Sequence, residues 1–268
     1  MNDPTMFEPR NVAPDTVSLI SYLPVPGMGV LPINAFVIRA AEPVLVDTGL
    51  GGLRSELLDA LESIVDPAEL RWIWLSHADV DHTGNLEAVL DRAPQARVVT
   101  TFVGMAKLGL SGFPLERCYL LNPGQELDVG DRKLLAVTPP TFDAPETTGL
   151  FDAKQRTLFS ADSFGALMSE PAESANAMGA GALREGMVAW ASVDAPWLGM
   201  VGAAPFRASL DTIGRLDAAT VLSSHLPAAE DLKDTLLDNL DAARGAPRFV
   251  GPDQAGLEEM MATSIAAA

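Results

Sequence analysis

The chain has 268 residues, enough for one large domain or two small ones, and 48% of them are hydrophobic, which allows a sizeable core. It carries 36 Asp and Glu residues against 18 Lys and Arg, a formal net charge of −18, which argues against nucleic-acid partners because these are bound through Lys and Arg. The single cysteine, Cys118, excludes an intrachain disulfide and a thiolate-rich metal site.

No sign of export or membrane insertion appears in the sequence. The first residues lack the basic segment and the apolar segment of a secretory signal. No uncharged apolar run reaches the roughly 18–20 residues that a membrane span needs. We therefore expect a soluble cytoplasmic protein with no membrane partner.

The first half of the chain alternates between predicted strands and helices. Apolar and β-branched runs predict strands, and helical periodicity predicts helices. The strands are at 18–24, 34–40, 43–49, 71–76 and 96–102, and the helices are at 53–65 and 86–93. Such alternation favours a sheet covered by helices.

The second half begins with three consecutive predicted strands, at 133–140, 147–153 and 155–161. Helical patterns follow between 180 and 218, then a short strand at 219–225 and an amphipathic helix at 230–244. No internal repeat, linker or composition break marks a second domain. We therefore expect a single domain over 1–268, with its core at about 18–245 and a C-terminal tail that frays.

Two of the three histidines, His77 and His82, lie within six residues that also contain Asp79 and Asp81. This cluster directly follows an apolar strand, and sites in α/β sheets lie beyond the carboxyl ends of strands. Imidazole and carboxylate are ligands for zinc, iron and manganese. A tight loop would direct His77 and Asp79 to one metal ion and Asp81 and His82 to a second. The alternative is a polar helix N-terminus capped by Asp81 or Thr83.

Two further residues share this placement at the end of an apolar strand. Asp47 ends the run "PVLVD", and His225, the third histidine, ends the run "ATVLSSH". A lone histidine at a strand end is more often structural. Here every histidine of the chain has this placement, so a site built from several segments would recruit them all.

The segments "VLVDTG" (44–49) and "HADVDH" (77–82) resemble, in order and spacing, the signature of the metallo-β-lactamase superfamily, His-x-His-x-Asp-His after a VDTG-like strand end. The resemblance runs from about 18 to 225 and implies an α/β fold, a four-layer αβ/βα sandwich with a two-metal site at one edge. Asp79 stands where the usual hydrolase has its second histidine. The flavodiiron branch of the superfamily carries a carboxylate there and binds two irons.

Three other segments resemble the flavodiiron branch. "TLFSADSFG" (157–165) resembles the segment with the metal-bridging aspartate, which falls on Asp162. "PPTFDAPETT" (139–148) resembles a segment that supplies a histidine ligand, but it has Asp143 at that position. His225 in "SSHLP" matches the final histidine of the branch.

The resemblance thus implies two ligand sets that share one aspartate. The first set is His77, Asp79, Asp143 and Asp162, and the second is Asp81, His82, His225 and Asp162. One imidazole and three carboxylates favour iron or manganese over zinc. The missing histidine leaves open a first site that is weak, empty or selective for another metal, and Asp143 has the alternative of a solvated turn acid. Asp47 takes a supporting role beside the ligands.

In flavodiiron proteins such a site binds or reduces O2 or NO, and an FMN domain follows the metal domain. This chain ends at residue 268, so we expect no FMN in it and an electron donor on a separate protein or partner subunit. A homodimer is expected from the same resemblance. Residues 166–206, rich in Met and Trp, would form an apolar lid over the site, or would simply pack as ordinary helices.

Hydrolysis is the alternative function. A two-metal site can lower the pKa of a bridging water for attack on a small ester, thioester, lactone or phosphodiester, with Asp81 binding metal and steering the hydroxide. Asp79 and Asp143 argue against this, since added negative charge lowers the Lewis acidity of the metal, and no Lys/Arg cluster is evident for an anionic substrate. A third interpretation is a binding or regulatory protein in which the metal is structural or lost.

Overall fold

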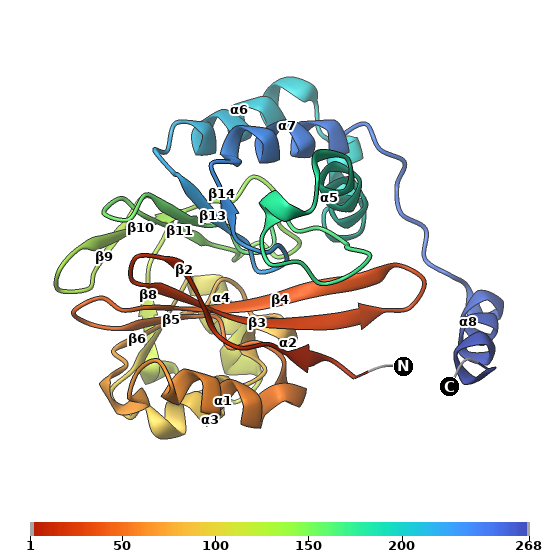
Figure 1. Cartoon of the computed structure of the whole chain (residues 1–268). Helices are drawn as coiled ribbons and strands as arrows, with labels where there is room; N and C mark the ends of the chain where they lie inside the picture. Colours follow the sequence, from red (N-terminus) through yellow and green to blue (C-terminus); the bar gives the residue numbers. More distant parts are fainter. Residues whose placement is uncertain (1–2, 267–268) are drawn as a thin grey trace.

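The computed structural model describes residues 3–266, which form two β-sheets between two layers of helices (Figure 1). The helices on the larger sheet are α1 (Arg54–Glu62), α3 (Leu86–Arg92) and α4 (Phe102–Leu110). Those on the smaller sheet are α5 (Ala180–Asp194), α6 (Ala203–Gly214) and α7 (Lys233–Ala243). The predicted four-layer αβ/βα sandwich is confirmed.

The larger sheet has eight strands in the order β1-β3-β4-β5-β6-β7-β8, with β2 paired to β3. They are β1 (Thr5–Met6), β2 (Arg10–Ala13), β3 (Thr16–Val25), β4 (Gly29–Ile38), β5 (Val44–Val46), β6 (Trp72–Trp74), β7 (Arg97–Thr100) and β8 (Cys118–Leu120). The smaller sheet has six strands in the order β14-β13-β12-β11-β10-β9. They are β9 (Glu126–Asp128), β10 (Lys133–Val137), β11 (Gly149–Asp152), β12 (Thr157–Phe159), β13 (Thr220–Leu222) and β14 (Ala229–Glu230).

The parallel strand pairs determine where polar residues gather. β5 pairs parallel with β6, and β12 pairs parallel with β13. The carboxyl ends of β5 and β6 therefore share one edge of the larger sheet, and those of β12 and β13 share one edge of the smaller sheet. Asp47, His77, Asp162 and His225 each follow one of these four strand ends within three residues.

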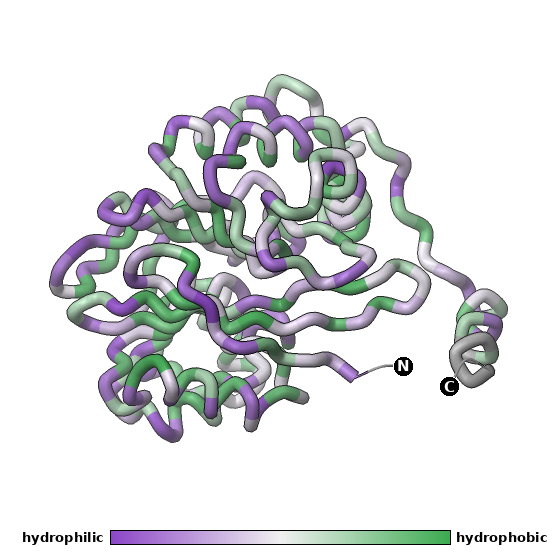
Figure 2. The backbone as a smooth tube through the Cα atoms, in the orientation of Figure 1, coloured by the Kyte–Doolittle hydropathy of each residue, from purple (hydrophilic) through white to green (hydrophobic). Residues whose placement is uncertain are grey.

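Three apolar cores occupy the three interfaces between the layers. Leu61 belongs to the core between helices and larger sheet, Phe36 and Phe159 to the core between the sheets, and Phe206 to the core beneath α5–α7. Apolar residues follow the strands, and hydrophilic residues mark the outer helical faces (Figure 2). This is the burial that the alternating sequence pattern predicts.

Each strand and helix predicted from the sequence is present, but several short elements were not predicted. Helix α4 replaces the end of the predicted strand 96–102, because β7 ends at Thr100 and the Thr101 hydroxyl accepts a hydrogen bond from Gly104 N at 3.2 Å. Phe102 is 66% exposed and Leu110 is 90% exposed, so apolar residues of α4 do not mark a single buried face.

The C-terminal helix α8 (Gln254–Ala266) follows α7 through an extended segment and lies beyond the helical layers, with Met260 near Gly27 at the turn between β3 and β4 (Figure 1). The sequence predicts that the C-terminal tail frays, but the tail is helical as far as residue 266. Residues 267–268 lie outside the described range. Within residues 3–266, none of the helices combines the length and the apolar character needed to cross a membrane.

Candidate metal centre

All seven residues predicted as metal ligands come together where the strand ends of the two sheets meet. Three overlapping groups contain them, namely His77 with His82 and Asp162, Asp81 with His82 and His225, and His77 with Asp79 and Asp143. Within each group one ligand atom per residue lies within 4.8 Å of the others. Atoms bound to one ion at about 2.0–2.2 Å lie no more than about 4.4 Å apart, so the groups are close to the spacing of ligand sets.

Asp162 lies at the centre of the cluster. Its Oδ2 is 3.2 Å from His77 Nε2, and its Oδ1 is 3.1 Å from His82 Nε2 and 3.0 Å from His225 Nε2. The flanking residues Ala161 and Phe164 have φ of 51° and 68°, a left-handed backbone that non-glycine residues rarely adopt. One carboxylate thus faces imidazoles from both sheets, and a strained turn holds it there.

Two buried atoms at this point lack hydrogen-bond partners in the described part of the chain. They are His82 Nε2 and Asp162 Oδ1, which are 3.1 Å apart without the orientation of a hydrogen bond. A buried polar atom without a partner is unfavourable, and a cation between two such atoms would satisfy both. The donor set and these two atoms therefore suit a bound metal ion.

Asp47 holds the cluster in place from behind. Its carboxylate accepts hydrogen bonds from Ser76 N at 2.8 Å and Ser76 Oγ at 2.9 Å, and lies 2.9 Å from His82 Nδ1. A proton on Nδ1 shared with Asp47 leaves His82 Nε2 free to face Asp162. The geometry is that of the supporting role predicted for Asp47.

His225 is oriented in a similar way by the backbone. Its Nδ1 is 2.8 Å from the carbonyl oxygen of Pro32, which can only accept a hydrogen bond, so the proton resides on Nδ1. Nε2 then points at Asp162 and lies 3.6 Å from Asp81 Oδ2. Both His82 and His225 therefore present the same nitrogen to the same space.

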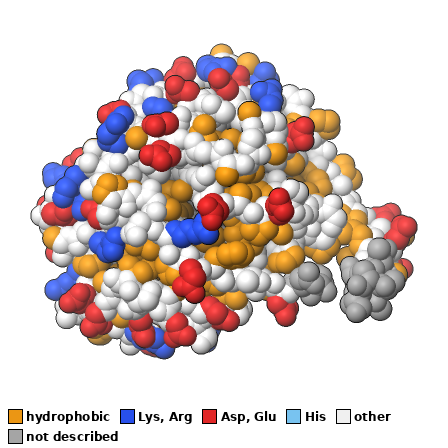
Figure 3. All heavy atoms as spheres, in the orientation of Figure 1, with side chains coloured by type: hydrophobic (Ala, Val, Ile, Leu, Met, Phe, Trp, Pro, Cys, Tyr) orange, Lys and Arg blue, Asp and Glu red, His pale blue; other side chains and the backbone are white. Residues whose placement is uncertain are grey.

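The carboxylates on the outer side of the cluster are partly open to solvent. Asp81 and Asp143 side chains are 24% and 34% exposed, whereas those of the three histidines are 1–2% exposed. No histidine appears on the face drawn in Figure 3. Asp81 and Asp143 are thus the more accessible members of the cluster.

The short helix α2 (Val80–Thr83) begins within this cluster. The alternative of a helix N-terminus capped by Asp81 or Thr83 is wrong, because both residues lie inside the helix and the N-cap residue is Asp79, whose side chain makes no capping hydrogen bond. Asp81 Oδ2 instead lies 3.4 Å from His82 Nε2. The two aspartates therefore face the cluster and not the helix end.

The carboxylates shift the protonation of the histidines in the absence of metal. Burial lowers the pKa of His82, but Asp162, Asp47 and Asp81 outweigh burial and raise the pKa well above its usual value. Burial likewise lowers the pKa of His225, and Asp162 raises it to about 9. Burial raises the pKa of Asp162, yet the histidines hold it well below its usual range. Protons therefore occupy positions that a metal ion would take, and metal binding would release them.

Comparison with known families bears on this cluster directly. Residues 28–225 match the metallo-beta-lactamase superfamily. The chain belongs to this superfamily. The match contains every predicted ligand, and the resemblance seen in the sequence is confirmed.

Flavodiiron and flavoprotein relatives are found within the superfamily. The chain is 34% identical to a putative diflavin flavoprotein A 3 of Nostoc sp. over 134 residues, which is 49% of this chain and 23% of that protein. It is 26% identical to the flavo-diiron protein FprA2 of Clostridium acetobutylicum over 140 residues, 52% of this chain and 35% of that protein. The aligned part is therefore well under half of either relative.

A solved structure has the same fold. Rubredoxin oxygen:oxidoreductase from the anaerobe Desulfovibrio gigas superposes with a TM-score of 0.79 and 16% sequence identity, over 90% of this chain and 62% of that chain. At this identity the likeness concerns the fold alone.

One acidic residue of this superfamily member was not predicted from the sequence. Asp194, at the end of α5, forms a group with Asp143 and Asp162 in which one oxygen per residue lies within 4.8 Å of the others. Burial, with Asp162 next in effect, raises the pKa of Asp194 to about 8. No local pattern distinguishes Asp194 from an ordinary acid at a helix end, so only the fold reveals it.

The predicted lid over 166–206 is present in part. Trp190 Nε1 donates to the carbonyl oxygen of Asp162 at 3.2 Å, and Trp197 Nε1 donates to that of Phe142 at 2.8 Å, next to Asp143. The methionines behave otherwise. Met187 on α5 is buried in the core, as ordinary helix packing predicts, Met168 is buried outside the helices at a β-bridge with Val30, and Met200 is 81% exposed.

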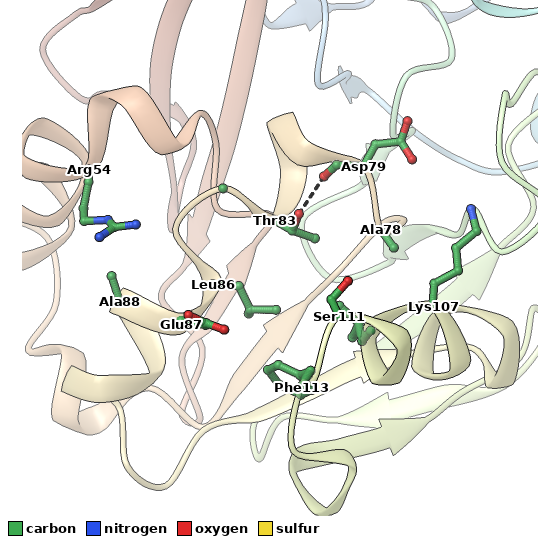
Figure 4. Close-up of a pocket in the computed structure, with 12 residues that line it drawn as sticks. Arg54, Ala78, Asp79, Thr83, Leu86, Glu87, Ala88, Lys107, Ser111 and Phe113 are labelled. Atoms are coloured by element: carbon green, nitrogen blue, oxygen red, sulfur yellow. Dashed lines mark hydrogen bonds between the residues drawn. The ribbon is translucent and has the colours of Figure 1, made fainter.

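A pocket of about 270 Å³ adjoins the cluster on the side of Asp79 (Figure 4). Arg54 and Lys107 line it from opposite sides. Lys107 Nζ lies 2.6 Å from Oε1 of the buried Glu146, which fixes its position. The sequence revealed no Lys/Arg cluster, but folding brings these two cations to one cavity.

Proposed function

We propose that this chain binds two metal ions, with iron favoured and zinc or manganese as alternatives, and that it binds or reduces O2 or NO. The observation that carries the proposal is the placement of Asp162, whose two oxygens lie 3.0–3.2 Å from Nε2 of all three histidines. The Nε2 atom of each histidine in the chain thus faces the same carboxylate, which would suit an aspartate shared by two metal ions.

The proposed ligands divide into two sets that share Asp162. The first set is His77, Asp79, Asp143 and Asp162, and the second is Asp81, His82, His225 and Asp162. Two of the groups of ligand atoms within 4.8 Å support this division, and a third joins His77 and His82 of the two sets through the shared Asp162. The carboxylate-rich first set favours iron or manganese over zinc.

The remaining residues around the cluster would prepare it for a small ligand. Trp190 and Trp197 cover one side, and their indole N–H groups hold the backbone beside Asp162 and Asp143. Asp47 keeps His82 in the orientation that directs Nε2 to the cluster. When bound, two reduced iron ions would supply electrons and open coordination positions for a diatomic molecule.

Reduction also needs an electron donor. The name of the D. gigas protein pairs rubredoxin with oxygen, and the Nostoc relative is named a diflavin flavoprotein. We propose a separate redox protein as the donor for this chain, and pairing of two copies of the chain as a homodimer.

The test is elemental analysis of protein purified without added metal, followed by anaerobic reduction and exposure to O2 while absorbance is recorded. Two irons per chain and an oxygen-dependent absorption band are expected. Asp217→Asn, at an exposed acid paired with Arg156, is the matched control and should behave as the unmodified protein. Fewer than two metal ions per chain after reconstitution with Fe(II) would overturn the proposal.

Hydrolysis is the second candidate, and the pocket beside Asp79 favours it. A cavity of about 270 Å³, lined by Arg54 and Lys107 and also by Asp79 and Glu87, has room for a small organic substrate that a diatomic gas would not need. Stoichiometric zinc, together with turnover of a small ester, thioester, lactone or phosphodiester, would establish this function in place of the first.

A further inference from the structure

The last turn of α5 presents two side chains to the metal centre. Trp190 and Asp194 are four residues apart, so they lie on the same face of the helix. Trp190 donates to the carbonyl oxygen of Asp162, and its ring centroid is 4.6 Å from that of His225. Asp194 lies one turn further on, where Asp143 and Asp162 each have an oxygen within 4.8 Å of one of its own.

The packing around α5 fixes this approach. A Cβ at Gly165 would lie 2.5 Å from Trp190 Nε1 and 2.7 Å from His225 Cβ, so only glycine lets the helix come so near. On the other side of Asp194, Ala195 is fully buried and Trp197 is anchored to the carbonyl oxygen of Phe142. The backbone that carries Asp194 is therefore held against the cluster from both sides.

The Asp194 carboxyl group has a buried oxygen, Oδ2, without a hydrogen-bond partner among the described residues. Asp162 Oδ1, 3% exposed as a side chain, is likewise without a partner. Asp143, Asp162 and Asp194 also each have an oxygen within 4.8 Å of one another, and three carboxylates gathered so closely are unfavourable unless a cation lies between them.

We propose that Asp194 is a further ligand of the first metal ion. Both of its neighbours, Asp143 and Asp162, belong to the proposed first ligand set, which makes Asp194 a ligand of that ion and not of the second. The first ion would then have a single imidazole, His77, and up to four carboxylates, a set that favours Mn²⁺ or iron over Zn²⁺. The inference rests on the proposed metal site.

The test compares Asp194→Asn with Glu185→Gln, an exposed acid on the same helix. Metal-free protein is loaded anaerobically with Mn²⁺ or Fe²⁺, and both affinities are measured by competition with a chelator. Asp194→Asn should weaken one ion at least about tenfold, as removal of groups that support metal ligands already does. The second ion and the Glu185→Gln protein should remain within about twofold of the unmodified protein.

A double substitution identifies which ion is affected. Asp143→Asn should weaken the same ion, and the combined variant should deviate from additivity because the two residues share one partner. Unchanged affinities for both ions in Asp194→Asn would overturn the inference. Failure of the unmodified protein to bind two ions would instead overturn the proposed function, so the two failures are distinct.

Circular dichroism of the metal-free proteins shows whether each variant is folded. If Asp194→Asn does not fold, Asp194→Ser takes its place, since a smaller side chain relieves crowding beside the two remaining carboxylates, Asp143 and Asp162. With one equivalent of Mn²⁺ bound, the electron paramagnetic resonance spectrum of the folded variant should differ from that of the unmodified protein. Identical spectra would count against Asp194 as a ligand.

Discussion

Replacement of Asp162 by Asn tests the shared-ligand role most directly. Asn has nearly the shape of Asp but no charge, and the Asp162 side chain is 3% exposed, so the surrounding packing is retained. The two oxygens of Asp162 lie 3.2 Å from His77 Nε2, 3.1 Å from His82 Nε2 and 3.0 Å from His225 Nε2. Both proposed ligand sets lose the same anion, and both ions should be weakened together.

The expected magnitude follows from the number of ions affected. Loss of a residue that merely supports a metal ligand lowers affinity about 10–100-fold, which sets the smallest effect for loss of the ligand itself. That is about 1.4–2.8 kcal/mol for each ion. Since two ions are affected, the product of their affinities should fall at least about 10²–10⁴-fold. Asp143, 3.8 Å from His77 Nε2 and 34% exposed, should affect only the first ion when changed to Asn.

The assay is chelator competition on Fe²⁺-loaded or Mn²⁺-loaded protein, with elemental analysis after removal of free metal. Asp217→Asn is the control, because Asp217 is 79% exposed and pairs only with Arg156 among its described ion pairs. Unchanged metal content in Asp162→Asn would refute the bridging assignment. Loss of a single ion would show that Asp162 serves one metal and not both.

Three more predictions follow from neighbouring contacts. Asp47→Asn removes the charge 2.9 Å from His82 Nδ1 and should weaken the second ion about 10–100-fold in the same competition assay, with the first ion unaffected. Gly165→Ala places a Cβ 2.5 Å from Trp190 Nε1 and should lower the free energy of unfolding in urea by about 1–3 kcal/mol, whereas Gly52→Ala, whose Cβ would meet nothing within 4 Å, should not. Burial lowers the pKa of His225, but Asp162 raises it to about 9, so the folded metal-free protein binds this proton more tightly than the unfolded chain does. This proton therefore adds at most about 3 kcal/mol to the free energy of unfolding. The contribution is complete below about pH 6.5 and is lost as pH rises through about 9, and thermal unfolding with and without metal will measure it.

Much of the candidate site was predictable because its signal is local. Asp47, His77 and His225 each interrupt an apolar strand with a polar residue, and parallel strands bring their carboxyl ends to one edge. Asp162 also follows a strand end but is an aspartate, a common residue in this chain, and Asp143 lies in a Pro-containing loop. Their predicted positions came from the resemblance to flavodiiron segments, and the structure brings both of them to His77.

Asp194 and helix α4 could not be predicted, for different physical reasons. Asp194 ends an amphipathic helix, where acids usually contact solvent, and it faces the cluster only because Leu183, Met187 and Ala191 pack α5 onto the smaller sheet. Helix α4 follows a strand without a break in hydrophobicity, and the Thr101 cap is a single residue. The contacts that decide the position of Asp194 are distant in sequence, whereas the cap of helix α4, between Thr101 and Gly104, is local but depends on a single residue.

The positions of the ligands in the fold imply a structural role for the metal pair as well as a chemical one. His77 and His82 follow a strand of the larger sheet, whereas Asp162 and His225 follow strands of the smaller sheet. Hydrogen bonds already join the sheets at this edge, since the Asn34 side-chain amide donates to the carbonyl oxygens of Ser223 at 2.9 Å and Leu226 at 2.8 Å, and His225 Nδ1 lies 2.8 Å from Pro32 O. Ions held by ligands from both sheets would close the edge by bonds that the unfolded chain cannot make. Metal binding would therefore contribute directly to the stability of the sandwich, and the proposed site and the fold would stabilise each other.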